Sequence, residues 1–418
     1  MTDVHVQRAA ERVLDRMRNK RGSRYTDATL LKHEIASSTE GFTLGAAEHS
    51  MRMAESAKRI LMCSTSTVLS GGDKVWLDLI THLDRAVFAQ YVVLPCDSIL
   101  SRRIEATGIR VRATMFDFSA VAPRSVKFFD DLFAAPRIDL VHINGFGGVP
   151  LIIAALNAGV RIVWHVHTRN IEHIKGPLQF ADRVISVSHA AKRSLLRWGL
   201  RPEKVIVVRN GIDLDVFKPG FYSRSALREY MELPEDARVI SMVARIEQRK
   251  RIDLMFSALP GVMDRLPNTI LVIAGETHPG TYDYHAKLRQ IARILGIDQN
   301  VVFLGFVDDI RKVYAVSDVL VSCSEEEALP TCILEAMAMG VPVIAPDTSG
   351  YLELVADGKE GILYESGDVA ALEEVVLRVL KDDAMRCELS MHGQEKARLF
   401  DIREHVRRIE DVYMSLVS

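Results

Sequence analysis

Two glutamates, Glu327 and Glu335, bracket the segment of this chain whose residue types are best suited to chemistry. The apolar run at residues 319–323 predicts a strand, and Glu327 falls on the loop that follows it. A helix is expected to begin near Pro330, because proline is tolerated at the first helical position. The free N–H groups at such a helix start favour a bound diphosphate. Glu335 could then reach ribose hydroxyls, and Glu327 could reach the hydroxyls of a sugar.

A pair of cations, Arg245 and Lys250, forms a second candidate cluster directly after the apolar run 239–244. Two positive charges at the end of a strand could neutralise a diphosphate and stabilise the charge that develops on a leaving group. A basic loop that only faces water is the alternative. The position at the carboxyl end of a strand, facing a cleft, favours binding.

Two glycines, Gly71 and Gly72, follow the first apolar run and precede a helical stretch. Because glycine has no side chain, the backbone there can approach a phosphate or an acceptor closely. Two glycines taken alone more often mark only a tight turn.

Polar residues also end two apolar runs in the first half of the chain. His165 and His167 alternate along one run, so their side chains share one face of the sheet, and His167 is preferred because it lies nearer the strand's end. His142 and Asn144 end the preceding run and are candidates for the acceptor side of a site.

The elements that must position these residues repeat along the chain from Arg59 onward. Short apolar runs alternate with amphipathic helical stretches, which is typical of parallel sheets covered by helices on both faces. The turn at Lys218, Pro219 and Gly220 separates two such series. The expected strands are 60–67, 91–95, 140–144, 161–166, 184–187 and 205–208 in the first series, and 239–244, 269–274, 301–304, 319–323 and 343–345 in the second.

The segment from Glu327 to Glu335, which runs on into Ala336-Met337-Ala338, resembles the donor-site signature of the family 4 retaining glycosyltransferases. Arg245 and Lys250 are similar to that family's basic pair. The resemblance implies an α/β protein of the GT-B class, in which two Rossmann-like domains face a central cleft. The family usually has glycine at the positions of Ala328 and Arg251, so this chain departs from the pattern twice.

What the resemblance implies for function is transfer of a hexose-type sugar, with retention, from a UDP-sugar or GDP-mannose to an unknown glycan, lipid-linked or small-molecule acceptor. It implies a hexosyltransferase of glycan, polysaccharide or glycolipid biosynthesis, with no cofactor and no metal. The carried-over site residues are catalytic Glu327, Arg245, Lys250 and His167; donor-binding Gly71, Gly72, Val307, Leu329, Pro330, Thr331 and Glu335; and acceptor-side His142 and Asn144.

Four parts of the chain are expected. Residues 1–57 form a helical N-terminal extension, 58–220 the first Rossmann-like domain, on the acceptor side, and 221–399 the second, which binds the nucleotide-sugar donor. Residues 400–418 form a terminal helix that docks back on the first domain. The extension has arginines on one side and a small apolar stripe, so it either lies on an anionic membrane surface or packs on the protein.

Composition limits the other possibilities. A net charge of −2 gives no basis for nucleic-acid binding. The five scattered cysteines and the absence of a long apolar run indicate a cytoplasmic protein, with any membrane contact peripheral at the inner face.

Two other functions compete with sugar transfer. A dehydrogenase is disfavoured because no G-x-G-x-x-G follows the first strand. A non-catalytic nucleotide-sugar-binding or scaffold protein of the same fold stays open, given Ala328 and Arg251. The Asp-x-Asp at Asp213 and Asp215 falls in the junction between the domains and is interpreted as structural.

Overall fold

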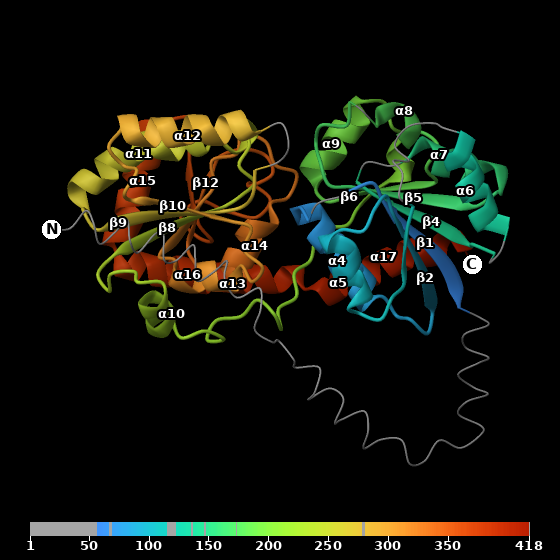
Figure 1. Cartoon of the computed structure of the whole chain (residues 1–418), viewed down its shortest axis with the longest axis horizontal. Coiled ribbons are helices and arrows are strands. Elements are labelled where there is room, and N and C mark those ends of the chain that lie inside the picture. Colours follow the sequence, from blue (N-terminus) through green and yellow to red (C-terminus); the bar gives the residue numbers. More distant parts are fainter. Residues whose placement is uncertain are drawn as a thin grey trace, which may run out of the picture.

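A computed structural model describes residues 57–66, 69–114, 123–134, 137–145, 148–172, 174–277 and 281–417. The predicted N-terminal extension, apart from Ala57, lies outside the described residues. The described chain forms two α/β domains that lie side by side (Figure 1), each built on one parallel sheet.

The first sheet has seven strands in the order β3-β2-β1-β4-β5-β6-β7. Its strands are β1 (Lys58–Ser64), β2 (Phe88–Leu94), β3 (Val111–Ala113), β4 (Leu140–Asn144), β5 (Arg161–Val166), β6 (Arg183–Ser186) and β7 (Val205–Val207). The accompanying helices are α4 (Gly71–His82), α5 (Ile99–Glu105), α6 (Pro123–Ala134), α7 (Val149–Asn157), α8 (Lys175–Leu178), α9 (His189–Arg197) and η1 (Pro202–Lys204).

The second sheet has six strands in the order β10-β9-β8-β11-β12-β13. Its strands are β8 (Arg238–Val243), β9 (Thr269–Ala274), β10 (Val301–Gly305), β11 (Val319–Val321), β12 (Val343–Pro346) and β13 (Ile362–Tyr364). The helices of this half of the chain are α10 (Arg224–Tyr230), η2 (Gln248–Lys250), α11 (Ile252–Arg265), α12 (Tyr282–Ile294), α13 (Arg311–Val316), α14 (Thr331–Ala338), α15 (Val369–Lys381), α16 (Asp383–Ala397) and η3 (Arg398–Phe400), and α17 (Ile402–Val417) follows them.

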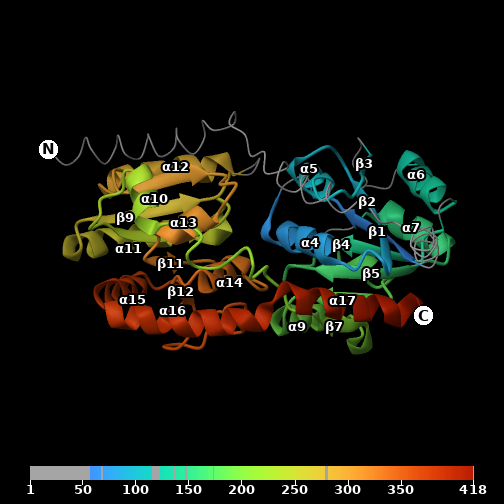
Figure 2. The same ribbon diagram turned by 90° about the horizontal axis from the view of Figure 1, so that it is seen from below.

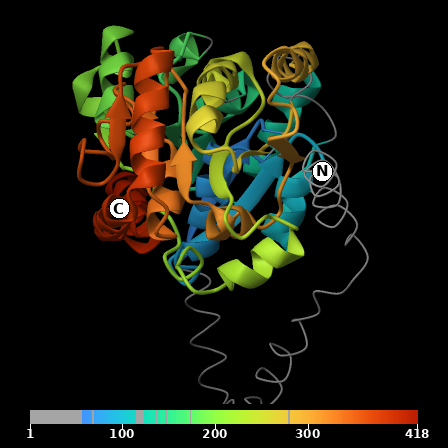
Figure 3. The ribbon, with the colours of Figure 1, turned by 90° about the vertical axis from the view of Figure 1, so that its left-hand side faces the viewer.

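Both sheets are buried on both faces, which explains why their strands are almost continuously apolar. In β1, Ile60 and Met62 enter one core of the first domain, whereas Leu61 and Cys63 enter the core on the opposite face. The second sheet likewise separates two hydrophobic cores, and helices flank it on both sides in the end-on view of Figure 3.

In each sheet the strand order reverses beside the first strand, between β1 and β4 and between β8 and β11. Ligands of such sheets bind in the crevice outside the carboxyl ends of the strands at this switch point. The topology therefore directs attention to the loops after β1, β8 and β11.

The chain crosses between the domains twice, and the two crossings touch. Ile212 N–H donates to Phe400 O at 2.8 Å, and Ile402 N–H donates to Ile212 O at 2.9 Å. A Cβ at Gly211 would lie 2.7 Å from Ile402 Cα, so only glycine permits this approach. These contacts agree with the structural interpretation of the junction that contains Asp213.

Helix α17 leaves the second domain and packs against the first. Figure 2 shows α16 and α17 following one another along the side of the molecule, with α17 beneath α4 and β5. Its buried residues Val406, Ile409 and Tyr413 join the core formed by Ile60 and Trp76. The last helix is thus part of the first domain's interior.

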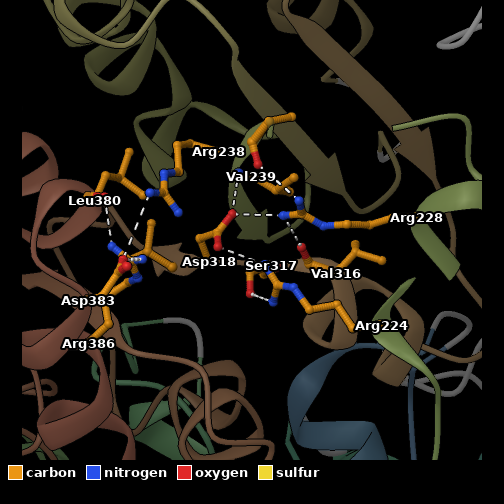
Figure 4. Close-up of polar contacts among 12 residues, drawn as sticks. Arg224, Arg228, Arg238, Val239, Val316, Ser317, Asp318, Leu380, Asp383 and Arg386 are labelled. Atoms are coloured by element: carbon orange, nitrogen blue, oxygen red, sulfur yellow. Dashed lines mark hydrogen bonds and ion pairs between the residues drawn. The ribbon is translucent and has the colours of Figure 1, made fainter. Parts of the chain in front are cut away.

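An ion cluster centred on Asp318, whose side chain is 9% exposed, lies at the amino ends of β8 and β11 (Figure 4). Asp318 Oδ2 accepts hydrogen bonds from Arg228 Nη2 at 2.9 Å and from Val239 N–H at 2.8 Å. Asp318 Oδ1 accepts one from Arg224 Nη2 at 2.7 Å. Arg228 also donates to the main-chain oxygens of Glu235 and Ala237. The cluster ties α10 to the sheet at the edge opposite the switch-point loops.

Candidate functional site

Lys250 and Glu327 are brought together although 77 positions separate them. Lys250 ends η2, after β8, and Glu327 lies on the loop after β11, so the two neighbouring strands deliver their side chains to one place. Lys250 Nζ donates a hydrogen bond to Glu327 Oε1, and each side chain is only 15% exposed. Arg249 Nη1 contacts the same carboxylate oxygen at 3.4 Å and donates to Glu326 O at 2.8 Å.

Two cations therefore share the Glu327 carboxylate. Burial alone would raise the pKa of Glu327, but the charges of Lys250 and Arg249 outweigh burial and lower it. The carboxylate stays ionised at neutral pH and serves as a hydrogen-bond acceptor. The stabilisation that it contributes is present at neutral pH and is lost as the pH falls through the lowered pKa.

Arg245 lies on the same edge of the sheet, and its side chain is 41% exposed. Its Nη2 lies 3.2 Å from Oε1 of Glu247. Glu247 also pairs with Arg249 at 2.8 Å. One acidic residue thus orients two of the cations while leaving the local charge positive, as a diphosphate requires.

The amino ends of two helices meet across the two domains. A Cβ placed on Gly71, the first residue of α4, would lie 3.2 Å from Thr331 Oγ1, on the first residue of α14. Helix amino ends carry partial positive charge and unpaired N–H groups. The arrangement offers an anion N–H donors from both domains.

The structure corrects one detail of α14. Pro330 was expected at the first helical position, but it is the N-cap, with extended backbone angles, and Thr331 is the first helical residue. The shift by one residue places the Thr331 hydroxyl, rather than the proline ring, opposite Gly71.

Glu335 is buried on α14, with 4% of its surface exposed. Its Oε2 accepts a hydrogen bond from Tyr314 Oη at 2.7 Å, and its Oε1 lies 4.0 Å from Lys74 Nζ of the first domain. The Tyr314 contact fixes the carboxylate. The other oxygen faces the first domain, where a ribose contact stays a prediction.

His167 lies just beyond β5 and has defined partners. Its Nε2 lies 2.8 Å from Asn144 Oδ1; since an amide oxygen only accepts, Nε2 carries the hydrogen and Nδ1 is the acceptor. Nδ1 has no hydrogen-bond partner among the described residues. Burial lowers the pKa of His167 to about 3, so the ring is neutral.

Asn144 and His142, the expected acceptor-side residues, are both buried. Asn144 is 2% exposed and holds His167. His142 is fully buried, with Nδ1 2.5 Å from Tyr413 Oη of α17. The C-terminal helix covers His142 through a contact between residues 271 positions apart, and an acceptor-side role for either residue stays a prediction.

We expect Gly72→Ala to reduce turnover about ten- to a hundredfold without unfolding the protein. A Cβ at Gly72 would lie 2.9 Å from His167 Cγ, so the ring must move, and misplacement of a reacting group by about 1 Å can cost about a hundredfold in rate. Steady-state kinetics with a thermal-melt check would measure it. Gly176→Ala is the control, because its Cβ would have no neighbour within 4 Å; equal kinetics in both variants would contradict the prediction.

The remaining predicted residues of the second domain make structural contacts. Val307 follows β10 and packs on the second domain's core. Leu329 O accepts a hydrogen bond from Asn210 Nδ2 at 3.4 Å, which joins the Glu327 loop to the domain junction.

The two carboxylates of the Asp-x-Asp have other partners. Asp215 pairs with Arg403, whereas Asp213 Oδ1 accepts from Asp215 N–H at 2.8 Å. These contacts occupy the Asp-x-Asp carboxylates structurally, and no three metal-ligating side chains gather within the described ranges.

Two family models match consecutive parts of the chain. The model described as Glycosyltransferase Family 4 matches residues 69–216, and the model described as Glycosyl transferases group 1 matches residues 223–398. The matched ranges include both facing helix ends, His167 and the Lys250–Glu327 pair. The chain belongs to the group 1 / family 4 glycosyltransferases.

Individual relatives extend this result. A D-inositol 3-phosphate glycosyltransferase of Nocardioides sp. is 30% identical over 249 residues, which cover 56% of this chain and 54% of the relative. D-inositol 3-phosphate glycosyltransferase 2 of Catenulispora acidiphila is 31% identical over 241 residues, which cover 56% of each chain. This chain thus spans about half the length of these two relatives.

Solved structures resemble more of the chain. Anabaena HepE in complex with UDP-glucose has a TM-score of 0.77 and 26% identity, covering 86% of this chain and all of HepE. A glycosyltransferase from Rickettsia africae has a TM-score of 0.76 at 17% identity, which shows the fold alone. These neighbours confirm the predicted GT-B fold.

The two departures of this family member have local explanations. Arg251, where the family usually has glycine, adopts a left-handed conformation with φ 47° and ψ 44°. Its side chain pairs with Glu325 and, at 3.4 Å, with Asp253. The ion pairs oppose the cost of positive φ, about 1–2 kcal/mol for a residue with a side chain. Ala328 is 5% exposed and packs in the hydrophobic core of the second domain that also contains Leu329 and Ile333.

Several contacting residues were not assigned from the sequence. Arg249, Lys74 and Tyr314 contact Glu327 or Glu335 directly. Arg249 and Lys74 stand inside the recognised motifs, so spacing within the motif could have indicated them. Tyr314 lies on α13, and nothing local in the sequence relates it to Glu335.

None of the helices in the described part of the chain has the length and apolar character needed to cross a membrane.

Proposed function

We propose that this chain is a retaining glycosyltransferase that moves a hexose-type sugar from a UDP-sugar or GDP-mannose to an acceptor. The observation that carries the proposal is the Lys250–Glu327 pair, beside Arg245, at the carboxyl ends of β8 and β11. The helix ends at Gly71 and Thr331 add N–H donors from both domains. Cations and N–H groups in this arrangement suit a donor diphosphate.

Each group has a role as the bond to the leaving nucleotide breaks. Lys250 and Arg245 bind the diphosphate and stabilise its growing negative charge, which is the main electrostatic task of the site. Glu327 accepts hydrogen bonds from the sugar's hydroxyls and orients the Lys250 ammonium. No cofactor enters this scheme.

His167 completes the site from the first domain. Because Asn144 fixes the hydrogen on Nε2, Nδ1 can accept a hydrogen bond from a hydroxyl of the donor sugar. Its lowered pKa keeps the ring neutral, so it adds no positive charge to the sugar side. Retention follows if the departing phosphate deprotonates the acceptor on the face that the leaving group occupied.

The decisive experiment combines binding and transfer. We expect UDP or GDP to raise the melting temperature, because a ligand at about a hundred times its Kd adds about 2.7 kcal/mol. UDP is tried first, since the similar HepE was solved with UDP-glucose. Transfer is then assayed over UDP-, GDP-, ADP- and TDP-sugars, and the anomeric configuration of the product is read by NMR. Nucleotide binding without transfer or hydrolysis would favour the non-catalytic alternative.

We expect turnover to persist in excess EDTA. The motivation is that Arg245 and Lys250 supply the positive charge on the diphosphate, whereas Asp213 and Asp215 are engaged in other contacts. Initial rates with and without chelator measure the effect. Activity that is lost in EDTA and restored by magnesium or manganese would contradict side-chain neutralisation of the diphosphate.

We propose that the acceptor binds on the side of the first domain. The reaction then belongs to glycan, polysaccharide or glycolipid synthesis at the cytoplasmic side of a membrane. Residues 1–56 fall outside the described chain, so their membrane or packing role stays a prediction.

A further inference from the structure

A carboxylate of the second domain caps a helix of the first. Glu353 Oε1 accepts a hydrogen bond from Ala190 N–H at 2.7 Å, and Glu353 Oε2 accepts one from His189 N–H at 3.1 Å. These are the first two N–H groups of α9, which lies on the side of the first domain that faces the second (Figure 1). A helix start favours a carboxylate because its N–H groups have no partners within the helix and it carries partial positive charge.

Helix α9 also has a local cap of its own. Ser188 Oγ accepts a hydrogen bond from Ala191 N–H at 3.0 Å, the usual arrangement for an N-cap serine. The helix can therefore begin at His189 without help from the second domain. What Glu353 adds is a link between the domains.

The Ala190 hydrogen bond is largely shielded from water. Ala190 is 2% exposed, and the Glu353 side chain is 12% exposed. Val187 and Ala191 of the first domain belong to the same hydrophobic cluster as Leu354 of the second. A donor in such surroundings is costly to leave without an acceptor, so the contact holds the two domains in one relative position.

The segment that carries Glu353 also touches the Glu327 loop. Residues 348–355, which we call the Gly350 turn, are held in consecutive turns by backbone hydrogen bonds between residues three or four positions apart. A Cβ at Gly350 would lie 2.7 Å from the carbonyl carbon of Glu327, so only glycine permits this approach. A displacement of Glu353 would therefore reach the Glu327 backbone through one short, internally bonded segment.

The two ends of this link belong to the two halves of the proposed site. Helix α9 follows β6, which pairs with β5, and His167 directly follows β5. Glu327 lies on the loop after β11 of the second domain. The link thus runs from the strand beside His167 to the carboxylate that holds Lys250.

We propose that Glu353 is a positioning residue that sets the place of the Glu327 loop relative to the first domain. It acts through the Gly350 turn and through α9 rather than by touching the donor. Its effect on turnover rests on the function proposed above, whereas the link from Glu353 to the Glu327 loop can be tested without any substrate. If Glu353 were only a helix cap, its loss would loosen α9 alone.

Amide hydrogen exchange of the full-length protein tests the link. In Glu353→Ala we expect exchange about threefold faster or more both at the start of α9 and in the Glu327 loop, because local opening becomes easier at both. Asp368→Ala is the matched control, since Asp368 accepts hydrogen bonds from the N–H groups of Ala370 and Ala371 at 2.8 and 3.0 Å within one domain. It should speed exchange at the start of α15 only. Unchanged exchange in the Glu327 loop of Glu353→Ala, or faster exchange there in the control as well, would overturn the proposal.

Kinetics then separate positioning from folding. In Glu353→Ala we expect kcat to fall about tenfold or more, since misplacement of reacting groups is costly in rate. The Kd of UDP, or of GDP if UDP does not bind, should stay within about twofold of the wild-type value, because Arg245 and Lys250 are untouched. Glu353→Gln keeps one oxygen that can accept a hydrogen bond and should recover part of kcat.

The control Asp368→Ala should keep the wild-type kcat. Normal kcat in Glu353→Ala, an equal loss of kcat and nucleotide affinity, or no recovery in Glu353→Gln would overturn the positioning role. If the wild-type protein neither binds a nucleotide nor turns over a donor sugar, the proposed function fails. The exchange experiment still decides whether Glu353 positions the Glu327 loop.

Discussion

Lys250→Ala and Glu327→Ala are each expected to reduce turnover about a hundred- to a thousandfold, the usual effect of removing one electrostatic stabiliser from an active site. Lys250 provides the least exposed ammonium at the proposed diphosphate position, and Glu327 holds it there. The fold should persist in both variants. In Lys250→Ala, Arg249 still lies 3.4 Å from Glu327, and in Glu327→Ala, Arg249 still pairs with Glu247. Initial rates and melting temperatures would be measured together.

The control for Lys250 is Lys359→Ala, which removes a second-domain lysine that is 63% exposed. It should retain full turnover. The double variant of Lys250 and Glu327 should lose less than the product of the two single effects, since the residues contact each other. Near-normal turnover in either single variant would show that the site has been assigned to the wrong residues.

Asp318→Ala should destabilise the second domain by about 3–5 kcal/mol, the usual cost of removing one member of a buried ion pair. Asp318 and Arg228 are each 9% exposed, so the variant leaves a buried guanidinium without its counter-ion. The Val239 N–H also loses its acceptor. Urea unfolding, followed by circular dichroism, would measure the loss.

Asp411→Ala is the matched control, because Asp411 is 67% exposed and its pair with Arg407 lies in solvent. No measurable destabilisation is expected there. The Asp318 variant that stays folded should bind UDP as the wild type does, since the cluster lies at the amino ends of the strands, away from the proposed site. Stability equal to that of the Asp411 variant would contradict the role given to this cluster.

The elements that the sequence predicted well are those whose signal is local. Long apolar runs gave the central strands of both sheets, with bounds shifted by up to three residues, as for β1, which ends at Ser64 rather than residue 67. Strands β3 and β13 were missed because each has only three residues, too few to establish a periodicity. The fold class could be predicted because it depends on the repeated pattern rather than on any single boundary.

The site was predictable where its residues belong to a contiguous motif, as Lys250 and Glu327 do. The sequence alone did not reveal contacts made by distant segments. Glu353 of the second domain, for example, accepts hydrogen bonds from the N–H groups of His189 and Ala190 at the start of α9. The burial of His142 under α17 is of the same kind. Such pairings depend on how the two domains and the last helix are placed.

The position of α17 has a consequence for the order in which the protein can be made. Domains generally fold as units in the order of their synthesis, yet the first domain's core includes Val406, Ile409 and Tyr413 from the end of the chain. On the ribosome, this domain must wait with an apolar face uncovered until residues 406–413 leave the exit tunnel. All strands of the second domain precede α17 in the chain, so this domain can fold before α17 is made. The first domain is synthesised first but is therefore completed last.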